Sequence, residues 1–224
     1  MLSKDSLQFL DDLKANNNRD WFITNKKRYE VFKKDYHQLV SDFLDEIKPL
    51  DASLEMLEIK HCTFRINRDI RFSKDKSPYK SHIGVWLSSG TKGNNRAGYY
   101  VHIEKGASFI AGGFYAPESD DLKKVRKEIA FFHEDLEAIL RNKTFRKEFD
   151  TFARTEKSCL KNPPRGYDKE HPAIELLKLK SFEVLQKFDI TEITQKDFVT
   201  KMTKKLIILK PLNEFMNRAL TADD

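Results

Sequence analysis

The order of hydrophobic patterns along this 224-residue chain predicts an α+β fold. Apolar residues recur at helical spacing over residues 1–50, alternate with polar residues through much of 55–116, and return to helical spacing over 118–222. Helices and strands that are segregated along a chain are typical of α+β proteins, whereas regular alternation indicates a parallel sheet. We therefore predict a single domain over residues 1–224, with a central antiparallel sheet packed by N-terminal and C-terminal helices.

Two helices are expected before residue 50. Residues 3–15 carry leucines at near-helical spacing behind a capping Ser3 or Asp5, and the three asparagines that follow favour a turn. A long helix should then run from about Asp20 to Lys48, because apolar and aromatic residues recur at threes and fours until Pro49 stops it.

Alternating segments in the middle of the chain predict strands at 56–66, 81–88, 98–104 and 107–115, with a turn at 91–96. In the third strand, Tyr100, His102 and Glu104 share one face. In the fourth, Gly112 and Gly113 indicate a bulge or a close approach of two backbones. Short strands joined by turns make the sheet antiparallel.

Helical spacing returns after Glu118 in two apolar stripes, the second of which consists of Phe145, Phe149 and Phe152. Residues 171–180 predict a short helix and residues 181–188 a returning strand. A last helix is expected to start near Thr194 and to bend or end at Pro211.

Composition limits the function classes. The chain has 41 basic and 35 acidic residues, a net charge of +6 and a pI near 9.1, which permits an anionic partner without requiring one. Cys62 and Cys159 lack metal-ligand spacing and indicate a reducing compartment. No signal peptide and no long apolar run is present, so we predict a cytoplasmic location without membrane association. The motifs of nucleotide-, dinucleotide- and zinc-binding enzymes are absent, so the sequence assigns no cofactor and no metal.

The most unusual stretch is basic. From His61 to Phe72 the residues alternate as in a half-buried strand, but the polar side carries arginines, and a lysine-rich loop follows. Guanidinium groups match phosphate and carboxylate oxygens in pairs. We therefore predict that residues 65–80, the basic segment, bind an anion, preferably a small phosphate- or carboxylate-bearing molecule. The predicted ligand-binding residues are Arg65, Arg68, Arg71, Lys74, Lys76 and Lys80.

Two geometries and one alternative remain open for this segment. If the strand stays extended, Arg65 and Arg71 lie about 20 Å apart and would track a nucleic acid, at ~3.3 Å per residue. If the chain bends at Asn67–Asp69, the arginines converge on one small ligand, and an arginine at position 68 on the apolar side favours that bend. Alternatively, the basic residues form internal ion pairs in a structural or partner-binding protein.

Further candidates depend on the tertiary structure. The sequence leaves open whether the protein is an enzyme; if it is, Tyr79, His82 and His102 are candidates for proton transfer. If their strands pair, the two histidines would face each other near Glu104, as a metal or acid–base pair. Trp21 and Tyr29 are either core residues or, if exposed, stacking residues for a planar ligand. Lys74, Lys76 and Lys80 belong either to a solvated loop or to a lid over the anion. No oligomeric state is predicted.

Four segments together resemble one bacterial protein family, named for a domain of unknown function, number 2461. They are FLDDLKANNNRDWFITNKKRYE, FRINRDIRFSKDKSPYKSHIG, AGYYVHIE and HPAIELLKLKSF. The resemblance spans nearly the whole chain and implies a single-domain protein. It implies no activity, cofactor or catalytic residue, so the site candidates above depend on the residues themselves.

Overall fold

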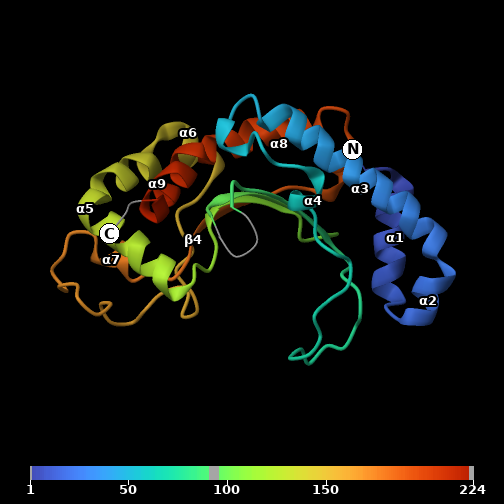
Figure 1. The fold of residues 1–224 in the computed structure, drawn as a ribbon, viewed down its shortest axis with the longest axis horizontal. Helices are drawn as coiled ribbons and strands as arrows, with labels where there is room; N and C mark the ends of the chain where they lie inside the picture. The colour runs from blue at the N-terminus through green and yellow to red at the C-terminus, as the bar shows by residue number, and fades with distance from the viewer. Residues whose placement is uncertain (1, 91–95, 222–224) are drawn as a thin grey trace. The chain divides into compact units, whose positions relative to one another are not determined.

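The computed structural model describes residues 2–90 and 96–221. A four-stranded antiparallel sheet is formed in the middle of the chain, with helices before and after it, so the predicted α+β fold is confirmed (Figure 1). The strands are adjacent in the order β1 (Ile83–Leu87), β2 (Gly98–Ile103), β3 (Phe109–Phe114) and β4 (Phe182–Lys187).

Contacts within the chain divide it into two compact units, and the strands are shared between them. Unit 1 comprises Met1–Leu87, Tyr100–Ile110 and Lys187–Lys204. Unit 2 comprises Ser88–Tyr99, Ala111–Gln186 and Lys205–Asp224. The single domain over residues 1–224 stays a prediction.

Unit 1 contains the helices that precede the sheet. They are α1 (Lys4–Ala15), α2 (Arg19–Thr24), α3 (Lys26–Ile47), the 3₁₀ turn η1 (Ala52–Leu54) and α4 (Ile59–Cys62), followed late in the chain by η2 (Ile190–Thr194) and the start of α8 (Phe198–Leu206). α1 begins as predicted, because the Ser3 hydroxyl accepts a hydrogen bond from the Ser6 N–H at 3.2 Å. α1 packs against α3 through buried Phe9, Leu13 and Phe32.

The helix predicted from Asp20 to Lys48 is interrupted, and the prediction of one continuous helix was wrong at Asn25. The backbone N–H and the side-chain amide of Asn25 both donate to the Trp21 carbonyl, at 2.9 and 3.0 Å, and this closes α2. α3 starts at the next residue and, as its spacing predicted, buries one face from Phe32 to Ile47.

Residues 56–66 do not form the predicted strand. After α4, residues 63–82 run out from the sheet and return as a long loop (Figure 1). Its two arms meet at a single bridge, where Arg68 N–H donates to the Pro78 carbonyl at 2.9 Å. Phe64 and Phe72, on the predicted buried side, are 48% and 95% exposed, so the alternation from His61 to Phe72 marks no buried strand face.

The other strands lie where alternation predicted them. In β2, Tyr99, Val101 and Ile103 are fully buried, while Tyr100 and His102 on the opposite face are half-buried. The returning strand predicted at 181–188 is β4. The close backbone approach predicted at the paired glycines is also present, because a Cβ on Gly113 would lie 2.1 Å from the Phe182 carbonyl oxygen of β4.

Unit 2 contains the helices between β3 and β4, which are α5 (Ser119–Arg141), α6 (Lys143–Glu148) and α7 (Ile174–Leu177). After β4 it contains the 3₁₀ turn η3 (Ile207–Leu209) and α9 (Lys210–Thr221). α5 packs against α9 (Figure 1). The predicted stripe of Phe145, Phe149 and Phe152 is buried, although α6 ends before the second of them. Each such side chain contributes about 1.5–3 kcal/mol when fully buried.

Two further sequence predictions concern the turn at 91–96 and membrane-spanning helices. The turn at 91–96 lies, apart from Arg96, outside the described residues. No helix within residues 2–90 and 96–221 is long and apolar enough to cross a membrane.

Candidate functional site

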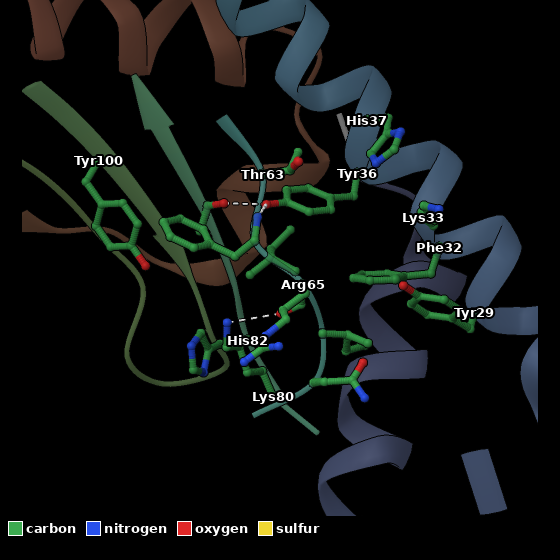
Figure 2. A pocket seen from close by; sticks show the side chains of 15 residues that line it. Tyr29, Phe32, Lys33, Tyr36, His37, Thr63, Arg65, Lys80, His82 and Tyr100 are labelled. Atoms are coloured by element: carbon green, nitrogen blue, oxygen red, sulfur yellow. Dashed lines mark hydrogen bonds between the residues drawn. The ribbon is translucent and has the colours of Figure 1, made fainter. Parts of the chain in front are cut away.

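A cavity of about 440 Å³ lies in unit 1, bordered by α3, the arms of the 63–82 loop and the first two strands (Figure 2). This volume is within the range of about 300–1,000 Å³ that is usual for small-molecule sites. Its lining combines aromatic side chains with basic ones. The aromatic residues are Tyr29, Phe32, Tyr36, Phe64 and Tyr100, and the basic or imidazole residues are Lys33, His37, Arg65, Lys80 and His82.

α3 supplies one wall of the cavity. Tyr29, Lys33, Tyr36 and His37 recur at spacings of three and four, which places them on one face of the helix. Figure 2 shows the Tyr29 and Tyr36 side chains extending from α3 toward the loop. From Leu39 to Ile47 the same helix buries its apolar residues, so the orientation of this wall is set by the core of unit 1.

Tyr36 connects three elements at the top of the cavity. Its hydroxyl donates to the Gly84 carbonyl in β1 and accepts from the Phe64 N–H at 3.2 Å. Burial raises the pKa of Tyr36, so the phenol keeps its proton and both hydrogen bonds persist at neutral pH. Tyr36 therefore holds the first arm of the loop at the edge of the sheet.

The sheet supplies the cavity floor, where the absence of a side chain at Gly84 makes room for Tyr100 on the neighbouring strand. A Cβ at position 84 would lie 2.4 Å from the Tyr100 hydroxyl oxygen. Burial raises the pKa of Tyr100, which therefore presents a protonated phenol.

The base of the loop is fixed from the other side by the turn between α1 and α2. The Asn17 side chain accepts from the Tyr79 N–H at 3.0 Å and donates to the Tyr79 carbonyl at 2.9 Å. The Tyr79 ring is 8% exposed and stacks on Phe22 with centroids 4.1 Å apart. Tyr79 does not line the cavity, and its position is that of a packing residue.

The basic side chains of the cavity have little internal compensation. Lys80 Nζ donates to the Arg65 carbonyl at 3.0 Å and lies 5.4 Å from the Phe64 ring centroid. Burial and, secondarily, the Arg65 charge lower the pKa of Lys80. Among the residues that the structure describes, the Lys33 ammonium and the Arg65 guanidinium have no ion-pair partner, and no carboxylate lines the cavity.

The remaining cationic residues of the basic segment lie outside the cavity. In residues 68–76, the loop tip, Arg68 pairs with Asp75, and Arg71 pairs with Asp69 at 2.6 Å. Lys76 donates to the Ile70 carbonyl at 3.0 Å, and Lys74 is exposed. The structure thus brings Arg65 and Lys80 into one cavity but does not gather Arg65, Arg68 and Arg71 around it.

The two predicted stacking residues separate. Tyr29 lines the cavity, and burial raises its pKa. Trp21 packs against Phe9, with ring centroids 5.9 Å apart, and is not a lining residue.

His82 and His102 face each other across β1 and β2, with ring centroids 4.7 Å apart. His102 Nε2 lies 3.2 Å from a Glu104 carboxylate oxygen, and His102 Nδ1 lies 3.1 Å from the Tyr100 hydroxyl. Burial lowers the pKa of His82, with the neighbouring His102 as a second cause, so His82 is neutral at pH 7. Of this group, His82 and Tyr100 line the cavity.

A model of one protein family, described as Conserved hypothetical protein (DUF2461), matches residues 5–215. The chain belongs to this family. The DUF2461 match covers every residue that lines the cavity. No curated protein and no solved structure matches the chain.

The cavity of this DUF2461 chain also contains residues that the sequence did not predict as site residues, among them Lys33, Tyr36, His37 and Tyr100. The first three carried a usable signal, because basic and aromatic residues share one helical face in residues 29–37. Tyr100 shares its strand face with His102 and Glu104, but only the pairing of β2 with β1 places it beside the basic segment.

A second cavity, of about 260 Å³, lies in unit 2 between α5, α6 and α7. Two of its arginines are engaged by neighbouring carboxylates, Arg141 by Glu137 and Arg154 by Glu175 at 2.8 Å. Because this lining mixes paired charges of both signs, the cavity in unit 1 is the better candidate for binding an anion.

Proposed function

We propose that the protein binds a small phosphate- or carboxylate-bearing ligand in the cavity of unit 1, with Arg65 and Lys80 as the principal anion-binding residues and Lys33 as a third cation. The observation that carries this proposal is the charge of the lining. Among the residues that the structure describes, three cationic side chains and no carboxylate surround a space of ligand size. An unpaired guanidinium beside such a space is a suitable partner for an oxyanion.

The aromatic lining favours a ligand that also carries a planar or apolar group. The partly exposed rings of Tyr29 and Phe64 can contact such a group. The protonated phenols of Tyr29 and Tyr100 can donate hydrogen bonds to it. Nucleotides, phosphorylated cofactor fragments and aromatic carboxylates combine both properties, and they form the ligand class that we expect.

The expected affinity follows from the number of charged hydrogen bonds. Each contributes roughly 1.5–3 kcal/mol net. Two or three of them correspond to dissociation constants between about millimolar and micromolar. Lys80 already donates to the Arg65 carbonyl, so its position relative to Arg65 is established before a ligand binds.

Nucleic acid is a second candidate ligand, favoured by one observation at the loop tip. Phe72 is 95% exposed, and the Arg71 guanidinium lies 5.8 Å from its ring centroid. An exposed aromatic beside a cation is a suitable stacking surface for an unpaired base. The internal ion pairs of Arg68 and Arg71 make this the weaker candidate, because they remove two charges from a basic stripe.

The test compares two arginines of one loop. A thermal-shift screen of nucleotides, sugar phosphates and aromatic carboxylates should identify stabilising ligands, whose affinities are then measured by calorimetry. Arg65→Ala should weaken binding by about 10- to 150-fold, the equivalent of one charged hydrogen bond. Arg71→Ala, outside the cavity, is the matched control and should bind like the parent.

Two outcomes contradict the proposal. Either no compound in the screen stabilises the protein, or Arg65→Ala and Arg71→Ala bind the ligand equally well. Binding to single-stranded oligonucleotides that falls steeply with salt and is lost in Arg71→Ala would support the nucleic-acid candidate instead. We retain a cytoplasmic location as part of the proposal, and both cysteines are free thiols.

A further inference from the structure

His82, His102 and Glu104 form a compact group of donor atoms on one face of the sheet. Each offers one nitrogen or oxygen, and these three atoms all lie within 4.8 Å of one another. Within the described part of the chain, this is the group of His, Cys, Asp and Glu residues that meets the spacing of a metal site. We propose that these three residues bind one divalent first-row transition ion, with Zn²⁺ as the reference ion.

The spacing of the donor atoms is close to that of a formed site. Zn²⁺ is bound at about 2.0–2.1 Å by imidazole nitrogen and at about 2.0–2.2 Å by carboxylate oxygen, so its tetrahedral ligands are separated by about 3.3–3.5 Å and ligands on opposite sides by at most about 4.3 Å. Donor atoms that lie within 4.8 Å of each other therefore need only a small side-chain adjustment. His102 Nε2 and Glu104 Oε2, 3.2 Å apart, already have the separation of neighbouring ligands.

The surrounding residues hold these side chains in place. The His102 ring stacks on Phe109, with centroids 4.8 Å apart and planes inclined by 14°. Lys14 Nζ lies 3.4 Å from Glu104 Oε1, which leaves Oε2 toward His102. With His102 Nε2 on the metal, the Nδ1–H can donate to the Tyr100 hydroxyl oxygen 3.1 Å away, which is a typical partner of a metal-bound imidazole.

The donor set limits which ion can bind. Two imidazoles and one carboxylate suit Zn²⁺, Fe²⁺ and Co²⁺, whereas Mg²⁺ and Ca²⁺ prefer oxygen ligands alone. Three protein ligands leave at least one coordination position for water or a substrate, as in catalytic rather than structural zinc sites. Because His82 also lines the cavity, that position would adjoin the cavity. The nearby Lys14 and Lys80 oppose a cation, so moderate affinity is expected.

The experiment uses the metal alone, so its result is separable from that of the anion proposal. Chelator-treated full-length protein is titrated with Co²⁺, followed by visible d–d absorption, and Zn²⁺ is then measured by displacing the Co²⁺. We expect saturation at one ion per chain. Tyr100→Phe removes a hydrogen-bond partner of the His102 ligand and should lower the Co²⁺ affinity by about 10- to 100-fold. His102→Ala removes the ligand itself and should lower the affinity by more.

Glu104→Gln is the second ligand variant. Because it preserves the shape of the side chain, we expect it to fold like the parent. His37→Ala is the control, since His37 lines the same cavity outside the donor group and its substitution should leave the titration unchanged. Circular dichroism and thermal unfolding confirm that each variant is folded. The proposal is overturned if no saturable binding occurs, if Glu104→Gln binds like the parent, or if His37→Ala loses binding to the same extent.

Discussion

The cavity of unit 1 and the loop tip both contain arginine and lysine, but only at the loop tip are the arginines paired with carboxylates. At the loop tip, Arg68 and Arg71 are each satisfied by an aspartate of the same loop. In the cavity, Arg65 has no carboxylate partner among the described residues, and no acidic side chain lines the space. All three arginines lie within seven residues of one another. Arg68 and Arg71 find aspartates nearby in the loop, whereas Arg65 lies beside a cavity without a carboxylate.

This contrast separates charge that stabilises a loop from charge that is available to a ligand. A net basic segment is compatible with both roles, because an ion pair and an anion site use the same guanidinium groups. Exposed pairs such as Arg71 with Asp69 contribute little to stability, but they occupy the arginine and compete with any incoming anion. The same contrast predicts how substitutions in the two regions should differ.

The largest loss of stability is expected from a substitution in the cavity wall. Tyr36→Phe removes the donor to the buried Gly84 carbonyl and the acceptor for the Phe64 N–H. We expect the free energy of unfolding to fall by about 2–4 kcal/mol, since two backbone groups lose their partner. Urea denaturation measures it. Tyr29→Phe is the control, because no hydrogen bond of the Tyr29 hydroxyl is described, and equal losses in both variants would remove the special role of Tyr36.

An intermediate loss of stability is expected from a substitution at the base of the 63–82 loop. Asn17→Ala deletes the two hydrogen bonds to the Tyr79 backbone and should lower the free energy of unfolding by about 1–3 kcal/mol. Faster amide hydrogen exchange at Tyr79 and Lys80 should accompany the loss. Asn16→Ala, which removes one exposed amide contact to the Asp12 carbonyl, should leave that exchange unchanged. Protection at Tyr79 that survives in Asn17→Ala would show that the Phe22 stack alone holds the loop.

The smallest effect is expected at the loop tip and depends on pH. Hydrogen bonds from Ser77, and then the Arg68 guanidinium, lower the pKa of Asp75 from 3.8 to about 2. Because the folded pKa lies below the unfolded one, this stabilisation is complete above about pH 4 and is lost as pH falls toward 2. An NMR pH titration of the Asp75 carboxyl measures the shift.

Asp75→Asn tests the same pair at neutral pH. It should free Arg68 and cause little change in global stability, because the Asp75 carboxylate is exposed. Ligand affinity of the cavity should stay unchanged, since neither residue lines it. An affinity that falls with Asp75→Asn would show that the loop tip and the cavity act together and would end the distinction between them.

Sequence patterns predicted much of the fold because they are local. Ser3 caps α1 as predicted, and β1 to β3 form in the segments where apolar and polar residues alternate. β4 forms in the segment that was predicted as a returning strand. The alternation from His61 to Phe72 misled because a strand also needs a partner, and the arms of this loop pair at one bridge only. Asn25 ends α2 through a side-chain hydrogen bond to the Trp21 carbonyl, which the spacing of apolar residues does not predict.

The candidate site was predicted only in part. Arg65, Lys80, His82 and Tyr29 were proposed from their residue types and do line the cavity. Lys33 and Tyr36 lie on a helix more than 25 residues away from the basic segment, and nothing in either segment specifies their proximity. The grouping of His82 with His102 and Glu104 followed once β1 paired with β2, as the sequence allowed but did not require.

By itself, the sequence determined the class of fold, the type and order of most elements, and an excess of positive charge in residues 65–80. These properties depend on neighbours within a few positions, so spacing and composition are enough to read them. The tertiary structure alone decided which cations face a cavity and which lie outside it. That choice depends on distances between side chains from remote segments, because electrostatic and hydrogen-bond partners are selected by proximity in space.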